Sequence, residues 1–163
     1  MFRPFEEVVR EHGEMVLRVC RVVLGPHDAD DAWSETFLAA LRAWPDLPED
    51  ANVEAWLVTI AHRKAIDAVR TKRRAPVPVG DTPDRSGDLG IPGARDADLW
   101  EAVRELPEKQ RQAVAYHFVA GLPYKDVASA IGGTPEAARR AASDGIRALR
   151  LRYRGAESPG VNP

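Results

Sequence analysis

The chain has 163 residues, of which 44% are hydrophobic and 29% are charged, and its formal net charge at pH 7 is −2. This composition suits a water-soluble protein with one compact domain or two small ones. No apolar run approaches the roughly 18 residues of a membrane span, and no signal-peptide pattern opens the chain, so we expect a cytoplasmic protein without membrane insertion. Cys20 is the only cysteine, which excludes a disulfide framework and a cysteine-based zinc site.

The first part of the chain predicts three helices. Apolar residues recur at three- and four-residue steps over residues 5–23, which is the spacing of one helix face. A second helix is predicted with Asp28 as its cap and Leu41 on its inward face. A third helix, residues 53–74, is predicted with Asn52 as its cap. Because no segment alternates apolar and polar residues as a strand does, the predicted fold class is all-α.

Residues 75–95 separate two parts of the chain. This segment, APVPVGDTPDRSGDLGIPGAR, holds four prolines and four glycines and almost no large apolar residue. Such a composition cannot build a core and predicts a flexible linker. The chain therefore divides into a helical domain over residues 1–74 and a second one over residues 96–153, and residues 154–163 are predicted to be a disordered tail.

The sequence of the second domain predicts four helices. The last two, in the segment LPYKDVASAIGGTPEAARR, have the pattern of a helix-turn-helix. Gly132 and Gly133 can adopt the positive φ that ends a helix. Thr134 can cap the next helix, and Pro135 suits its first position. An ordinary helical hairpin is the alternative. In the helix before this unit, Phe118 is among the apolar residues predicted to face inward.

Basic residues gather on two predicted helices although the chain as a whole is acidic. Between Arg139 and Arg154 there are six lysines and arginines against one aspartate, and the same counts hold between His62 and Arg74. Two such strips are typical of phosphate contacts, and two solvated helix faces are the alternative. The last helix is predicted to present to the DNA major groove the side chains of Glu136, Arg139, Arg140, Ser143 and Arg147.

Four carboxylates lie near the start of the second helix: Asp28, Asp30, Asp31 and Glu35. The helix macrodipole favours negative charge there, and an acidic docking face for a basic partner is a second explanation. A metal site is a third, although the sequence implies no loop geometry that would gather the ligands. A hydrolase is disfavoured, because the four histidines are dispersed over different helices and no phosphate loop, nucleophile elbow or HExxH motif occurs.

Taken together, these segments resemble a known family. DADDAWSETFLAALRAW followed by AWLVTIAHRKAID is similar to the second domain of extracytoplasmic-function (ECF) sigma factors, the promoter-recognition subunits of bacterial RNA polymerase. LPEKQRQAVAYHFVAGLPYKDVASAIGGTPEAARR resembles their fourth domain. The resemblance implies a specificity factor that opens promoters, not an enzyme, with no cofactor and no metal ion. A sigma-like helix-turn-helix regulator without promoter-melting activity is the alternative.

The resemblance also implies roles for three sets of residues. Docking on the clamp helices of the polymerase β′ subunit would involve Asp30, Asp31, Ser34, Glu35 and Phe37. Reading of the −10 promoter element, where bases are flipped out of the nontemplate strand, would involve His62, Arg63, Asp67, Arg70 and Arg74. Reading of the −35 element would involve Arg139, Arg140 and Ser143. The implied partners are core RNA polymerase, through β′ and the β flap, promoter DNA, and an anti-sigma protein as regulator.

Overall fold

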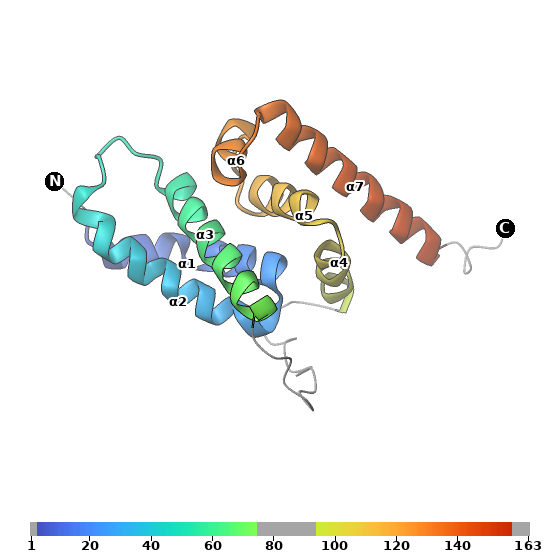
Figure 1. Ribbon diagram of the computed structural model, residues 1–163, viewed down its shortest axis with the longest axis horizontal. Coiled ribbons are helices and arrows are strands. Elements are labelled where there is room, and N and C mark those ends of the chain that lie inside the picture. Colours follow the sequence, from blue (N-terminus) through green and yellow to red (C-terminus); the bar gives the residue numbers. More distant parts are fainter. Residues whose placement is uncertain (1–2, 75–93, 158–163) are drawn as a thin grey trace.

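The structure, a computed structural model, describes residues 3–74 and 94–157, and within these ranges it contains helices and no strands (Figure 1). The all-α prediction is therefore confirmed. Residues 75–93 of the predicted linker and residues 158–163 of the predicted tail lie outside the described residues. The helices and turns in chain order are α1 (Phe5–Leu24), α2 (Pro26–Ala43), the 3-10 turn η1 (Trp44–Asp46), α3 (Val53–Arg74), α4 (Ala94–Arg104), α5 (Glu108–Val114), the π-helical turn η3 (Ala115–Val119), α6 (Tyr124–Ile131) and α7 (Pro135–Glu157).

Helices α1, α2 and α3 pack against one another as the N-terminal domain. The rings of Phe5 and Trp33 contact that of Phe37, with centroids 6.3 and 4.8 Å apart. Trp33 also donates from Nε1 to the carbonyl oxygen of Gly13 at 2.8 Å. A Cβ at Gly13 would lie 3.4 Å from the Trp33 ring, an ordinary van der Waals contact, so the indole lies directly against α1. The buried core residues of this domain include Val8, Val16, Cys20, Ala29, Ala32, Ala40, Leu57 and Ala61.

Side-chain capping follows the prediction at α3 but not at α2. Asn52 Oδ1 accepts a backbone N–H of the first turn of α3 at 3.1 Å. Asp28 is not a cap, because α2 begins earlier, at Pro26, directly after Gly25 with its left-handed φ of 88°. The Asp28 carboxylate instead forms an ion pair with Lys72 at 3.1 Å. This pair joins the start of α2 to the end of α3.

The C-terminal domain contains the predicted helix-turn-helix, formed by α6 and α7. Gly132 and Gly133 have φ values of 91° and 93°, and Thr134 Oγ1 accepts a backbone N–H of α7 at 3.1 Å. The predicted turn chemistry is therefore confirmed. Two boundaries differ from the prediction, because α4 begins at Ala94, inside the predicted linker, and α7 continues to Glu157.

A glycine in the middle of α7 allows close packing against α5. A Cβ at Gly145 would lie 2.8 Å from Cγ2 of Val114, closer than two apolar carbons approach without repulsion. The same side of α7 carries Ala138 and Ala142, which are 2% and 0% exposed. Small residues on this side therefore bring the backbones of α5 and α7 together.

The π-helical turn η3 sets the side-chain directions between α5 and α6. The N–H of Ala120 donates to the carbonyl of Ala115, five residues earlier, at 3.0 Å. This wider turn rotates the side chains that follow it relative to an α-helix. Phe118, which is predicted to face inward, is 56% exposed, whereas Tyr116 is 1% exposed. The inward prediction for Phe118 is wrong because it assumed an uninterrupted α-helix.

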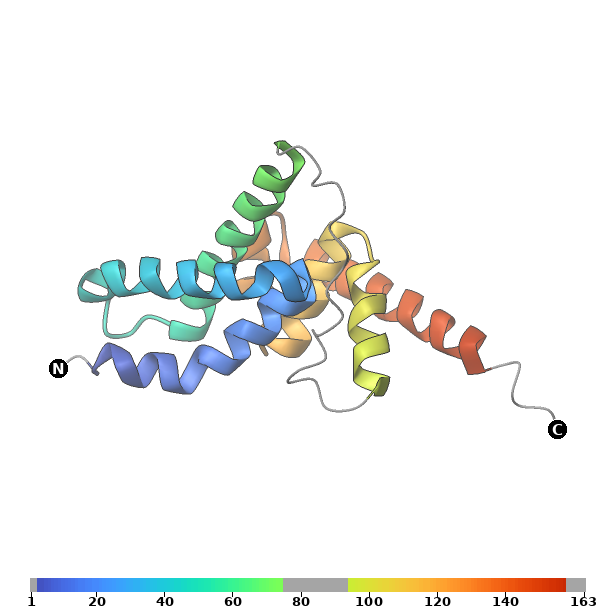
Figure 2. The ribbon, with the colours of Figure 1, turned by 90° about the horizontal axis from the view of Figure 1, so that it is seen from below.

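The two domains pack against each other, with α3 beside α6 and α1 beside α4 and η3 (Figures 1 and 2). One continuous cluster of buried side chains includes Val19 and Val58 of the N-terminal domain and Val103 and Leu122 of the C-terminal domain. Each domain thus completes its core with residues of the other. The periodicity of single helices does not predict this contact.

Candidate nucleic-acid interface

One face of α7 carries all five side chains predicted for the helix-turn-helix. The four later ones lie three, four, seven and eleven residues after the first, which places them on one side of the helix, and all five are exposed. The C-terminal end of α7 extends away from the N-terminal domain (Figure 2). The five residues are Glu136, Arg139, Arg140, Ser143 and Arg147.

The outer side of α3 carries a basic strip that is narrower than predicted. Arg63, Asp67 and Arg70 are exposed and share one side of the helix. Arg74 is the last residue of α3, and its side chain lies outside the described part of the structure. Two arginines and one aspartate therefore make up the described part of the predicted −10 set on this surface.

His62 departs from the prediction that places it on the outer side of α3. It is 7% exposed, and its Nδ1 lies 2.7 Å from the Tyr116 hydroxyl, with the two rings edge to face. Burial lowers the pKa of His62; the carboxylate of Glu108 raises it and the Arg63 guanidinium lowers it. Burial is also the main cause that raises the pKa of Tyr116. A DNA contact through His62 is incompatible with this packed arrangement, because the C-terminal domain covers the side chain.

Helix α2 presents an exposed acidic face, with one exception among the predicted residues. Asp30, Asp31, Ser34 and Glu35 are exposed. Phe37 is only 6% exposed, because its ring fills the core of the N-terminal domain. Phe37 therefore lies in the core of the N-terminal domain and not on the exposed acidic face, and its docking contact stays a prediction.

Two leucines extend this face and were missed as surface residues. Leu38 and Leu41 are 53% and 50% exposed, seven and ten residues after Asp31, which places them on the same side of α2. The prediction that Leu41 faces inward is wrong, because Phe37 and Ala40 form the buried side of α2 near its C-terminal end. A sequence signal exists for Leu38, a large apolar residue that falls outside the inward stripe.

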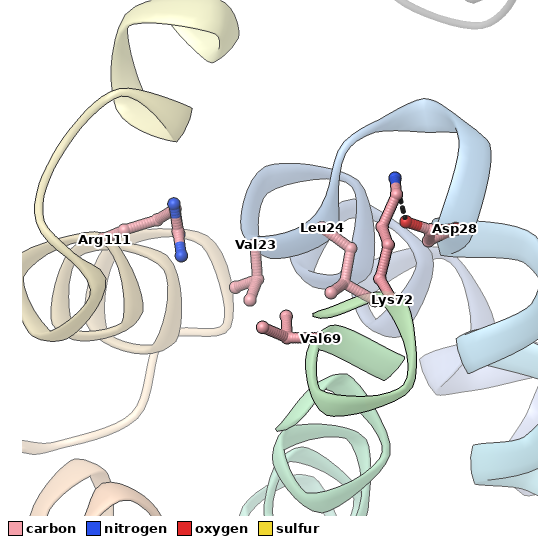
Figure 3. Close-up of a pocket in the computed structure, with 6 residues that line it drawn as sticks. All are labelled: Val23, Leu24, Asp28, Val69, Lys72 and Arg111. Atoms are coloured by element: carbon pink, nitrogen blue, oxygen red, sulfur yellow. Dashed lines mark hydrogen bonds and ion pairs between the residues drawn. The ribbon is translucent and has the colours of Figure 1, made fainter. Parts of the chain in front are cut away.

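A shallow pocket lies at the joint between the two domains (Figure 3). Asp28 and Lys72 pair with each other in its wall, and Arg111 donates from Nη1 to the carbonyl oxygen of Arg104 at 2.8 Å. Because its walls come from both domains, the pocket exists only while the domains are packed. Its lining residues are Val23, Leu24, Asp28, Val69, Lys72 and Arg111.

The described side chains offer few features for catalysis. Across residues 3–72 and 99–152, no three histidine, cysteine or carboxylate side chains gather as a metal site would require. Burial raises the pKa of the Cys20 thiol to about 12, which keeps it protonated and unreactive. Among the helices of the described residues, none is long and apolar enough to cross a bilayer.

Comparisons with known proteins agree with the two-domain arrangement. The family described as Sigma-70 region 2 matches residues 8–75, and Sigma-70, region 4 matches residues 96–149. The ECF RNA polymerase sigma factor SigK of Mycobacterium tuberculosis (strain H37Rv) is 30% identical over 150 residues, which cover 83% of this chain and 76% of SigK. SigE of Mycolicibacterium smegmatis is 29% identical over 143 residues, covering 78% of this chain and 53% of SigE.

Two solved structures share the fold. CnrH, in complex with the cytosolic domain of CnrY, matches with a TM-score of 0.71 at 22% identity over 93% of this chain and 88% of CnrH. RpoE of Bartonella quintana, in complex with the anti-sigma factor NepR, matches with a TM-score of 0.69 at 21% identity over 90% of this chain and 96% of RpoE. Both regions, in the right order, together with the identity to SigK over most of its length, show that the chain belongs to the ECF sigma factor family of RNA polymerase.

Proposed function

We propose that this sigma factor uses three exposed helix faces for three separate contacts. The acidic and apolar face of α2 docks on the β′ clamp helices of core RNA polymerase. The outer side of α3, with Arg63 and Arg70, contacts the −10 element, and the face of α7 around Arg139 and Arg140 reads the −35 element. The C-terminal domain also contacts the β flap. The chain acts as a specificity factor, and we assign no catalytic reaction to it.

The observation that supports this proposal best is that α2, α3 and α7 each have an exposed charged side and a buried apolar side. On α2, α3 and α7, most of the charged residues that the family resemblance implies are exposed, and apolar residues on the other side hold the helix in the core. Arginines on an exposed helix can contact guanine through two hydrogen bonds or bind phosphate. An acidic strip next to exposed leucines suits a partner surface that is basic and partly apolar.

Binding to core polymerase tests the role of α2. We expect the triple charge reversal Asp30→Lys, Asp31→Lys and Glu35→Lys to abolish co-purification with core enzyme, because like charges would then face a basic partner. The matched control is Glu6→Lys with Glu7→Lys, two exposed acidic residues in the first turn of α1. Unchanged association of the triple variant would refute the docking face.

Binding to promoter DNA tests the role of α7. Arg139→Ala and Arg140→Ala should each weaken binding, and an arginine that reads a base should also relax sequence preference at one position. Lys109→Ala, at an exposed cation of α5, serves as the control. DNA affinity that does not fall with added salt would contradict phosphate contacts by either basic strip.

We also propose an anti-sigma protein as regulator. The two solved relatives were each determined as a complex with a second protein, CnrY for CnrH and the anti-sigma factor NepR for RpoE. On this chain, the exposed Leu38 and Leu41 of α2 supply apolar surface that such a protein would cover. Leu38→Asp with Leu41→Asp should prevent capture of that protein, identified by affinity purification from the native host.

A sigma-like repressor that binds DNA without opening it is the second candidate, because His62 of the −10 set is covered in the packed arrangement. Transcription by purified core polymerase from the chain's own promoter separates the two. Transcripts support the sigma role; DNA binding without transcripts supports the repressor.

A further inference from the structure

A stack of aromatic side chains lies beside the first turns of α7. The imidazole of His117 lies parallel to the ring of Tyr124, with centroids 3.9 Å apart and an interplanar angle of 14°. The Arg139 guanidinium lies over the same tyrosine ring, 5.4 Å from its centroid. Phe118 contacts His117 edge to face with centroids 4.7 Å apart. These contacts join η3, the first residue of α6 and the fifth residue of α7.

His117 is held in this stack by the backbone. Its Nδ1 lies 2.8 Å from the carbonyl oxygen of Leu122, and since a carbonyl can only accept, the imidazole donates from Nδ1. The π-helical turn η3 directs His117 toward the α6 side while Tyr116 faces the core. The imidazole is thereby fixed at both its edge and its face, and it fixes the Tyr124 ring in turn.

The Tyr124 ring restricts an otherwise mobile side chain. Arg139 is exposed, and a long exposed side chain samples many rotamers that binding must remove. A guanidinium is attracted to the face of an aromatic ring, so the ring favours rotamers that keep the Arg139 guanidinium over it. Arg139 is the fifth residue of α7, and in a helix-turn-helix the N-terminal residues of the second helix approach the base edges.

We propose that Tyr124, supported by His117, is a positioning residue that holds the Arg139 guanidinium in place for DNA recognition. This inference rests on the proposed contact of Arg139 with the −35 element. According to this inference, His117 and Tyr124, which lie outside the recognition face of α7, contribute to DNA affinity and base preference. Arg140, the neighbouring arginine, is not part of the stack and supplies the internal comparison.

The experiment is a double-mutant cycle read by DNA binding. A duplex is first selected from a randomised pool by the full-length protein, and its affinity is then measured for each variant. Tyr124→Leu removes the ring and keeps apolar volume, Tyr124→Phe keeps the ring, and Arg139→Ala removes the guanidinium. Thermal unfolding of each variant checks that the fold is retained.

We expect Tyr124→Leu to weaken binding about two- to fivefold, the factor that corresponds to an exposed cation–π contact. It should also relax base preference at the position where Arg139→Ala does, and it should have no further effect in the Arg139→Ala background. Tyr124→Phe should bind like the unmodified chain. In the cycle with Arg140→Ala, the effects should be additive.

Each other outcome overturns a different claim. If Arg139→Ala weakens binding and Tyr124→Leu does not, or tightens it, the positioning role fails and the DNA contact stands. Equal losses for Tyr124→Leu with and without Arg139 show a structural effect only and overturn the inference. If Arg139→Ala leaves DNA affinity unchanged, the proposed contact of Arg139 fails, and the role of Tyr124 fails with it.

Discussion

The substitution Tyr116→Phe removes one oxygen atom from the contact between the two domains. The Tyr116 hydroxyl lies 2.7 Å from Nδ1 of His62, and the two side chains are 1% and 7% exposed. The phenylalanine ring keeps the packing, but His62 Nδ1 is left buried without its partner. An unsatisfied buried polar group costs about 1–3 kcal/mol, so we expect the free energy of unfolding to fall by about that amount.

Urea denaturation followed by circular dichroism measures this change, and small-angle X-ray scattering reports whether the domains separate. Because the hydrogen bond joins the domains, the lost free energy should favour a more extended state with a larger radius of gyration. Tyr124→Phe is the matched control, since the Tyr124 contacts described above use the ring face. Equal stability and equal radius for Tyr116→Phe and the unmodified chain would refute the reasoning.

Three further predictions concern stability. Because burial lowers the pKa of His62, the unfolded chain binds a proton more readily than the folded chain. The free energy of unfolding is therefore retained above the ordinary histidine pKa of about 6.5 and falls as pH drops below it. In urea denaturation between about pH 7.5 and pH 5, His62→Gln should reduce this fall, and an unchanged pH dependence would contradict the assignment. Gly145→Ala gains about 1 kcal/mol of helix propensity, but it places a Cβ 2.8 Å from Val114 Cγ2, an overpacking that costs about 1–3 kcal/mol. We therefore expect a net loss of stability that Val114→Ala relieves. A Gly145→Ala protein more stable than the unmodified chain would show that the contact relaxes freely. Thr134→Ala should lower the unfolding free energy by about 1 kcal/mol through loss of the α7 cap, measured by thermal denaturation with Thr134→Ser as the control that retains the hydroxyl.

Local features of the fold could be predicted from the sequence because they depend on neighbouring residues. The caps at Asn52 and Thr134 and the left-handed Gly132 follow from side-chain and backbone chemistry within a few residues. Phe118 could not be placed, because an α-helical and a π-helical turn differ by one residue and the sequence pattern does not distinguish them.

The candidate sites show the same division between local and tertiary information. The five residues on α7 could be placed on one face from their spacing alone. His62 could not, because its burial depends on Tyr116, 54 residues further along the chain. Leu41 could not be placed either, since helical periodicity gives the direction of a stripe but not where the neighbouring helices end.

The π-helical turn has a consequence for how this protein tolerates change in chain length. One residue of Ala115–Val119 is in excess of what an α-helix would need to span the same turn. Deleting one residue there would let i→i+4 bonding continue through the segment, so the side chains inside it would turn while the chain after it keeps its place. Because α7 packs directly against α5, the deletion should leave the exposed arginine face of α7 where it is and should instead displace His117 and Phe118.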